Sequence, residues 1–135
     1  MPTDIDFYIL SCTSLDACGV FICRLSEKAY HQGNHLYIYT ASSQDSQKFN
    51  ELLWTFRDTS FVPHPGPIQI DHCPPPTEHT DILANLTPEP PSFYTNFKRV
   101  LEIIPNDATL KAAGRKKYKY YQQQGCKLKT HNISF

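Results

Sequence analysis

Short runs of apolar, β-branched and aromatic residues alternate along the chain with longer stretches that place apolar residues at helical spacing. The first run, residues 5–10 (IDFYIL), has the pattern of a strand buried on both faces of a parallel sheet. From about Leu15 the apolar residues recur at helical spacing until Gly33 stops the run. The chain is therefore predicted to open with a central strand followed by a helix.

A second strand and helix follow in the same order. Residues 35–40 (HLYIYT) form the predicted strand, and residues 43–54 (SQDSQKFNELLW) form the helix, with Ser43 as the expected N-cap. The apolar residues of this helix are expected to face inward: Phe49, Leu52 and Leu53. Because repeated strand–helix units join parallel strands through right-handed crossovers, we predict an α/β fold, a three-layer Rossmann-like sandwich with a mostly parallel sheet.

The middle of the chain is rich in proline. Nine of the eleven prolines lie within residues 61–91, where they are expected to fix exposed loops at strand ends. Two short strands are predicted inside this region, at residues 68–71 and 82–86. The proline-rich stretch is too short and too interleaved with strands to be a linker, so one domain, residues 1–135, is expected.

The last part of the chain predicts a strand segment and a long helix. Residues 97–104 (FKRVLEII) form a strand or a helix-to-strand segment, which Pro105 ends. The helix that follows is expected to be capped by Asn106 or Asp107 and to stop before Gly125.

Charge is divided unevenly along a chain whose 13 acidic and 13 basic residues balance overall. Residues 1–107 carry all 13 acids and six bases, a net charge of −7, whereas residues 108–135 carry seven bases and no acid. A basic C-terminal part on an acidic body favours a contact surface for an anionic partner, although a solvated basic helix face has the same composition.

Cysteine usage and hydropathy indicate a cytoplasmic, soluble protein. The five cysteines are odd in number, contain no C-x-x-C pair and follow no secretory segment, so they are interpreted as reduced thiols. No apolar run approaches the roughly 20 residues needed to cross a bilayer, so no membrane contact is expected.

The residues that nucleotide or metal chemistry requires are missing from the expected places. The first strand-to-helix turn, SCTSLDACG, has one glycine instead of the G-x-G-x-x-G loop that lets a backbone approach a pyrophosphate. His31 and His35 are separated by a helix-ending glycine, and His72, Cys73 and His79 lack a fourth ligand at a recognised spacing. We therefore predict no cofactor and no metal. A small Rossmann-like enzyme that uses a cysteine or a nucleotide site is the alternative class.

The final helix carries a basic stripe with an aromatic neighbour. Lys111, Arg115 and Lys119 recur every four residues, and Tyr118 flanks them. Arginine can hold a carboxylate through two hydrogen bonds, and tyrosine supplies a rigid wall for an apolar side chain. This chemistry suits an acidic peptide that ends in an apolar residue, and it equally suits a nucleic-acid backbone with a stacked base.

A second set of aromatic residues surrounds the end of the second helix. Its members are the aromatic Trp54, Phe56 and Phe61, with Val62 and Pro63 next to them in the loop. Aromatic anchors in a loop often make a protein interface, and packing against the core beneath the loop is the other interpretation.

Five segments of the chain occur in the order found in the chi subunit of bacterial DNA polymerase III, a family that the chain resembles over nearly its whole length. They are DFYIL at the start, LLWTF and SFVPH in the middle, DIL, and LKxxxRxxYKxY near the end. The resemblance implies a Rossmann-like domain without nucleotide chemistry, acting as a non-catalytic subunit of the polymerase complex.

The resemblance also implies partners and assigns residues to them. The family forms a heterodimer with the psi subunit of the clamp loader and binds the acidic C-terminal tail of single-stranded-DNA-binding protein. The positions that match its tail-binding helix are Lys111, Arg115, Tyr118 and Lys119. Those that match its psi-binding region are Trp54, Phe61 and Pro63, a surface for which a helicase is a further candidate. Any DNA contact is expected to be indirect or weak, and the additional Lys116 and Lys117 are expected to widen the positive surface.

Overall fold

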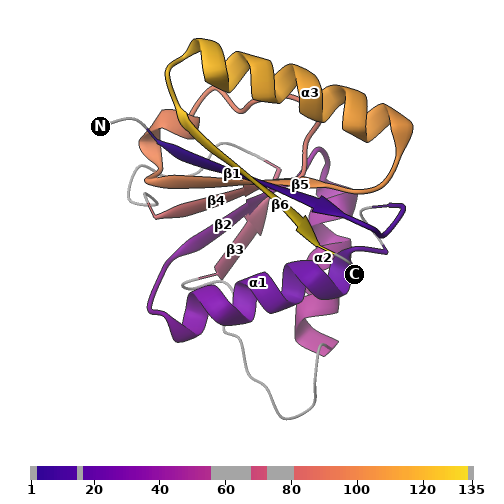
Figure 1. Ribbon diagram of the computed structural model, residues 1–135. Coiled ribbons are helices and arrows are strands. Elements are labelled where there is room, and N and C mark those ends of the chain that lie inside the picture. The colour runs from indigo at the N-terminus through magenta and orange to yellow at the C-terminus, as the bar shows by residue number, and fades with distance from the viewer. Residues whose placement is uncertain (1–2, 15–16, 56–67, 73–80, 134–135) are drawn as a thin grey trace.

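A computed structural model of the chain describes residues 3–14, 17–55, 68–72 and 81–133. Within these residues, six strands form one sheet and helices lie on both of its faces (Figure 1). The elements in chain order are β1 (Asp4–Leu10), α1 (Gly19–His31), β2 (Leu36–Tyr39), α2 (Ser43–Thr55), β3 (Ile68–Asp71), β4 (Ile82–Asn85), the 3-10 turn η1 (Tyr94–Asn96), β5 (Arg99–Ile104), α3 (Ala108–Gln123) and β6 (Lys127–Ile133).

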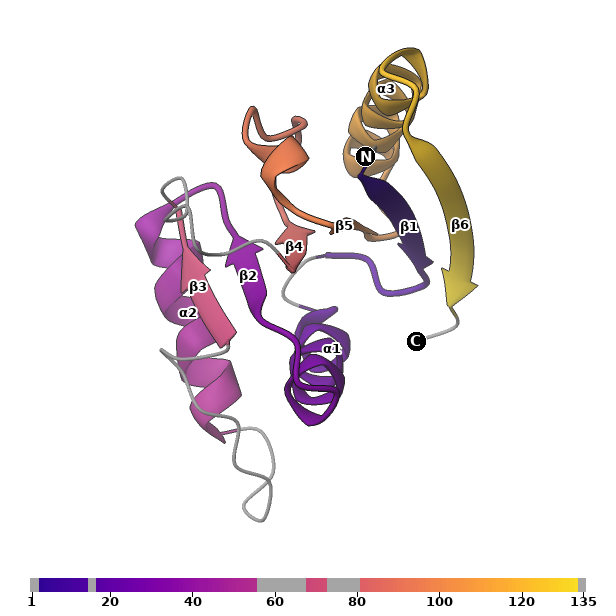
Figure 2. The same ribbon diagram turned by 90° about the vertical axis from the view of Figure 1, so that its left-hand side faces the viewer.

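The sheet is parallel throughout, with the strand order β3-β2-β4-β5-β1-β6. β1 is internal, paired with β5 on one side and β6 on the other. Figure 2 shows α1 and α2 on one face of the sheet and α3 on the other. The predicted three-layer α/β fold with a parallel sheet is therefore confirmed.

Each face of the sheet has its own apolar core. The core between the sheet and α1 and α2 includes Leu10, Ile22, Leu36, Ile38, Phe49, Leu101 and Ile103. The core on the α3 face includes Ile5, Phe7, Tyr37, Leu83, Tyr94, Val100, Ile104 and Tyr121. The side chains of β1 and β5 alternate between the two cores, as strands buried on both faces must.

The helices begin and end close to where the sequence predicts them, with one correction at a cap. The Oγ of Ser42, not that of Ser43, accepts a hydrogen bond from the backbone N–H of Asp45 at 3.2 Å, because α2 already includes Ser43 as its first residue. α1 starts at Gly19, four residues later than predicted. In the part of the chain that the structure describes, no helix is long and apolar enough to cross a membrane.

Two of the cysteines are not reduced thiols, contrary to the sequence-based expectation. The turn between β1 and α1 folds back so that Cys12 and Cys18 form a disulfide, with their Cα atoms 5.6 Å apart. Cys23 and Cys126 are free, and Cys73 lies outside the described residues. Nothing in the sequence marks two cysteines six residues apart as a pair, because the pairing depends on how the chain turns between β1 and α1.

β6 is an element that the sequence did not predict. Gly125 adopts a φ of +78°, a left-handed conformation that ends α3 and reverses the chain. Residues 127–133 then run beside β1 in parallel register, from Asp4 opposite Lys127 to Leu10 opposite Ile133. The basic C-terminal part of the chain is thus partly an edge strand, and its few apolar residues give it no strong strand pattern.

Candidate functional site

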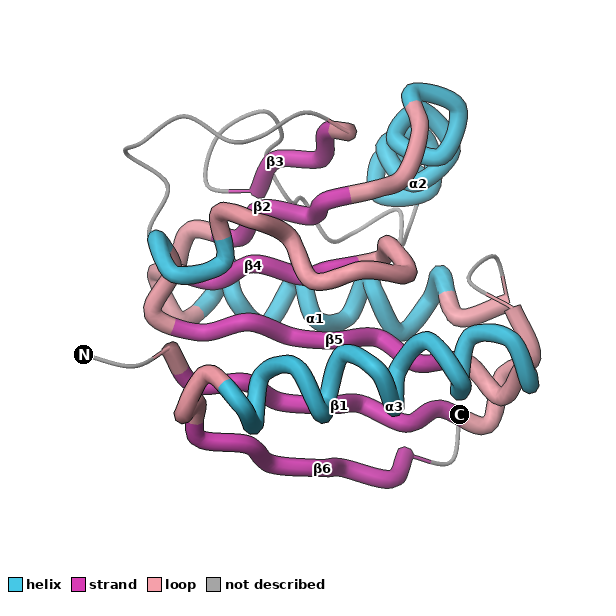
Figure 3. Tube along the Cα trace, turned by 90° about the horizontal axis from the view of Figure 1, so that it is seen from above, coloured by secondary structure: helices cyan, strands magenta, loops and turns pink. Residues whose placement is uncertain are grey.

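α3 lies along the sheet above β5 and β1, with β6 beside it (Figure 3). Pro105 ends β5, and Asp107 caps the helix, since its carboxylate accepts a hydrogen bond from the backbone N–H of Leu110 at 3.0 Å. Of the two predicted caps, Asn106 and Asp107, the helix uses Asp107. The helix is amphipathic, so one side packs on the sheet and the other carries most of its charges.

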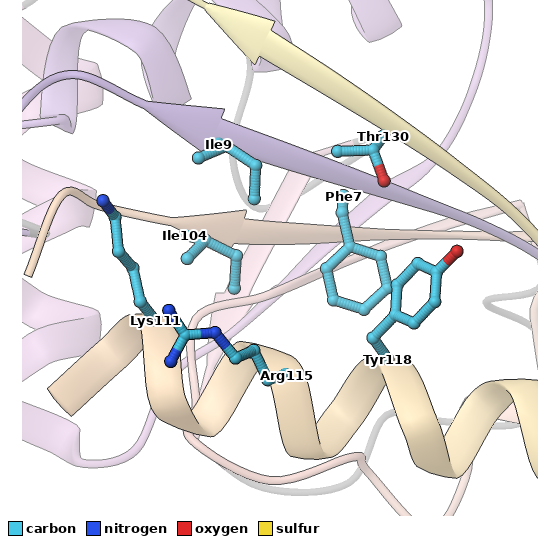
Figure 4. A pocket seen from close by; sticks show the side chains of 8 residues that line it. Phe7, Ile9, Ile104, Lys111, Arg115, Tyr118 and Thr130 are labelled. Carbon is cyan, nitrogen blue, oxygen red and sulfur yellow. The ribbon is translucent and has the colours of Figure 1, made fainter. Parts of the chain in front are cut away.

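A pocket of about 340 Å³ opens where α3 passes over β1 and β6. Its walls come from the consecutive elements β5, α3 and β6 and from β1, which is far from them in the sequence (Figure 4). The lining residues are Phe7 and Ile9 of β1, Ile104 of β5, Thr130 of β6, and Lys111, Gly114, Arg115 and Tyr118 of α3. Most of this lining is apolar, so the pocket suits an apolar group.

Gly114 determines how closely α3 approaches the strands below the pocket. It is buried, and a Cβ atom at this position would lie 3.0 Å from Cδ1 of Ile104. Glycine inside a helix costs about 0.5–1 kcal/mol relative to alanine, so its place here reflects the contact with Ile104. The sequence offered this signal, an isolated glycine in a helix, but the prediction did not use it.

One end of the pocket is aromatic. The ring of Tyr118 lies 5.3 Å from that of Phe7, centroid to centroid, at an interplanar angle of 55°. Phe7 is buried, whereas Tyr118 is 38% exposed and so offers a ring face or edge to solvent. The two rings form a wall against which a further ring can pack in the tilted or offset geometry that aromatic side chains prefer.

The other end of the pocket is cationic. Figure 4 shows the Arg115 guanidinium beside the Lys111 side chain at this end, away from Tyr118. Neither cation forms an ion pair with another residue in the described ranges. Lys119 is exposed and does not line the pocket, so the structure brings together three of the four predicted residues of α3 and leaves the fourth outside.

Lys117 belongs to the core, which corrects the expectation that it widens the positive surface. Its side chain is only 3% exposed, and its Nζ donates to Oε1 of Glu102 at 2.7 Å. It also donates to the backbone oxygen of Thr87 at 2.9 Å. Lys116, one residue earlier, is exposed as expected. Lys117 lies within a run of basic residues. Nothing in that run indicates that its side chain pairs with Glu102, a buried acid 15 residues earlier.

Glu102 sits at the centre of a network that joins α3 to two strands. The Tyr121 hydroxyl donates to its Oε2 at 2.6 Å, and the Asn85 amide donates to both carboxylate oxygens at 3.1 and 2.9 Å. Burial raises the pKa of Glu102, while the Lys117 charge and the donated hydrogen bonds act in the opposite direction. Burial, followed by the nearby Glu102 carboxylate, raises the pKa of Tyr121 far above its ordinary value, so its hydroxyl remains a donor.

The whole chain can be compared with known proteins. Residues 1–129 match the family described as DNA polymerase III chi subunit, HolC. The chain is 34% identical over 138 residues to DNA polymerase III subunit chi of Pseudomonas aeruginosa, with 97% of each chain covered. The chain belongs to the DNA polymerase III chi subunit family. Relatives of the same name are 29% identical in Haemophilus influenzae, covering 98% of this chain and 99% of the relative, and 26% identical in Escherichia coli, covering 92% and 94%.

The second set of residues that the chi resemblance singles out lies elsewhere in this chi-family chain. Trp54 is in the last turn of α2, which covers the face of the sheet opposite α3. The side chain of Trp54, and the whole of Phe61 and Pro63, lie outside the described residues.

Cys23 of this chi-family chain is poorly suited to act as a catalytic nucleophile. Burial raises the pKa of the Cys23 thiol to about 11, so little thiolate forms there at neutral pH. Within the described ranges no three histidine, cysteine or acidic residues cluster as metal ligands would. Cys73 and His79 of the proline-rich loop lie outside those ranges.

The buried network predicts a large effect of losing its cation. Lys117→Met should lower the free energy of unfolding by about 3–5 kcal/mol, because it leaves the Glu102 carboxylate buried without a counter-charge. Lys116→Met, on the exposed side of the same helix, should change it by less than about 0.5 kcal/mol. Urea unfolding of the two variants beside the parent measures both values. Equal midpoints for the two variants would contradict the assignment of Lys117 to the core.

Proposed function

We propose that this chi-family chain is a non-catalytic accessory subunit of the DNA polymerase III holoenzyme, working in the cytoplasm at the replication fork. It links the clamp loader, through the psi subunit, to single-stranded-DNA-binding protein. The link to single-stranded-DNA-binding protein is made by its acidic C-terminal tail, which binds in the pocket beside α3.

The observation that carries the proposal is the division of the pocket into an apolar part and a cationic end. A peptide that ends in an apolar residue presents an apolar side chain and a carboxylate on the same carbon atom. The side chain fits between Ile104, Phe7 and Tyr118, and the carboxylate fits beside Arg115. A guanidinium can donate two parallel hydrogen bonds to a carboxylate, which fixes the orientation of the chain end.

Charge on the exposed side of α3 supports an acidic partner. Lys119 is exposed next to the pocket residues and forms no ion pair with another described residue. A surface of this kind attracts acidic segments over distances up to the Debye length, about 8–10 Å at physiological salt. Lys111 and Arg115 then hold the chain end.

Single-stranded nucleic acid is the competing ligand, because exposed tyrosines and cations also suit bases and phosphates. The mostly apolar lining of the pocket favours the peptide, since it suits an apolar side chain, whereas bases stack on open aromatic faces. Salt separates the two ligands. A stripe that binds several phosphates loses affinity steeply as salt rises.

The psi subunit is proposed to bind around Trp54, Phe61 and Pro63. Its support is the aromatic composition of this region, which is typical of interface anchors. Because α2 lies on the face of the sheet opposite α3, the end of this helix is separated from the tail pocket by the sheet. A subunit that holds two partners at once needs separate surfaces of this kind.

Tail binding should depend on Arg115 and on the terminal side chain of the peptide. Arg115→Ala should weaken binding of a synthetic acidic tail peptide by on the order of tenfold to a hundredfold, because a hydrogen-bonded charge pair is lost. Removal of the terminal apolar residue from the peptide should have a comparable effect on its binding to the parent chain. Titration calorimetry at two salt concentrations measures the affinities.

Lys116→Ala is the matched control, since this residue lies on the opposite flank of α3, beside Pro88 and Glu89. It should leave tail affinity close to that of the parent, and the melting temperatures of both variants should stay near the parental value. If Arg115→Ala binds the peptide as tightly as the parent chain, or if both variants fail equally, the site has been misplaced.

The psi surface should be sensitive to Phe61. Truncation of an aromatic anchor at the centre of an interface typically costs about 2 kcal/mol or more, so Phe61→Ala should weaken association with psi while the isolated chain stays folded. Co-purification with psi, beside a melting curve of the chain alone, tests both parts. Unfolding of the isolated variant would place Phe61 in the core instead.

A further inference from the structure

The outer edge of β6 has backbone groups that no described residue uses. The ladder between β1 and β6 pairs Leu10 with Ile133, and the backbone oxygen of Ile133 accepts from the Ser11 N–H at 3.2 Å. Because N–H and C=O directions alternate along a strand, every second residue back from Ile133 bonds inward to β1. The residues between them point their N–H and C=O groups away from the sheet: Leu128, Thr130 and Asn132.

One of these outward-facing residues belongs to the pocket. The side chain of Thr130 lines the pocket beside α3, while its backbone groups face the open edge. Figure 3 shows β6 as the outermost strand on this side, next to α3. A bound peptide whose last side chain occupies the pocket can therefore extend out of the pocket alongside β6.

The edge carries two lysines that form no ion pair with another described residue. Lys127 and Lys129 project on the sheet face opposite α3 and line a cavity of about 220 Å³ with Asp4, Asp6 and Arg99. Asp6 is not available to them as a counter-charge, because its two carboxylate oxygens are held by Arg99 and by His131, the latter at 3.0 Å. Arg99 and His131 thus occupy both oxygens of Asp6, and the side chains of Lys127 and Lys129 stay exposed.

The two lysines favour an acidic strand over a second copy of β6 as the partner of this edge. A second copy of β6 would set lysine beside lysine, which is how natural sheets prevent edge-to-edge pairing. An acidic strand about 4.8 Å away would set carboxylates beside the same lysines. After Asp107 the chain has no acidic residue that could take the place of the partner's carboxylates beside these lysines.

We propose that the acidic segment ahead of the terminal residue of the tail adds to β6 as a seventh strand of the sheet. This inference rests on the proposed function and specifies how the same site holds its partner. The terminal residue occupies the pocket, the segment before it hydrogen-bonds to Leu128, Thr130 and Asn132, and alternate carboxylates face Lys127 and Lys129. Main-chain bonds supply affinity in such additions, and side chains supply specificity.

Backbone N-methylation of the tail peptide tests the inference with the full chain. Two modified peptides are compared with an unmodified reference peptide. The first carries N-methyl groups at the odd-numbered positions of the acidic segment, and the second carries them at the even-numbered positions. Strand addition turns every second N–H toward β6, so one modified peptide should bind about tenfold more weakly and the other like the reference. This alternation is expected for a parallel and for an antiparallel strand.

The outcomes separate this inference from the proposed function. If the unmodified peptide binds with dependence on Arg115 but both modified peptides match it, or both weaken equally, strand addition is wrong and the pocket assignment stands. If the unmodified peptide does not bind, the proposed function fails and the added strand fails with it.

A variant of the chain gives a second readout. Replacing both Lys127 and Lys129 by alanine should weaken binding about fivefold, beyond the effect of Lys116→Ala, because two cross-strand charge pairs are lost. Bound peptide should also slow hydrogen exchange at the amides of Leu128, Thr130 and Asn132. Unchanged exchange at these three amides in the saturated complex would overturn the inference.

Discussion

The buried carboxylate of Glu102 constrains the layer that α3 forms on the sheet. A fully buried charge is tolerated only where a cation and hydrogen-bond donors reach it. α3 supplies both from residues four apart, since Lys117 donates to one oxygen at 2.7 Å and Tyr121 to the other at 2.6 Å. Asn85 of β4 completes the set. Because these contacts must be made together, they fix the rotation of the helix about its own axis.

The fixed rotation decides what the other side chains of α3 face. With about 100° between successive helical residues, Lys111, Arg115 and Tyr118 fall within a sector of about 60°, turned by about 100–160° from Lys117 toward β6. This sector is the wall of the pocket. Lys119 lies about 40° beyond Arg115, and Lys116 lies on the opposite flank, which is why neither lines the pocket. In the proposed function, recognition of the tail thus depends on an ion pair that the tail does not contact.

The sequence predicted the elements that a local pattern defines and missed those that distant contacts define. Five strands, three helices and the Asp107 cap follow from periodicity and capping residues. The basic run predicts Lys117 as a surface cation because Glu102, its partner, is 15 residues away in another element. β6 has little apolar character, since it is an edge strand. The pocket could be anticipated only on its α3 side, because Phe7 and Thr130 reach it through the strand order, which no local pattern contains.

We propose that the groove between α3 and β6 holds the chain end of an acidic peptide. At 15.5 kDa the protein suits amide chemical-shift mapping during titration with the tail peptide. We expect the largest shifts at Phe7, Arg115, Tyr118 and Thr130, on three elements that meet only at the pocket, with little change at Lys116. Shifts that follow the exposed side of α3 and spare β1 and β6 would contradict the account.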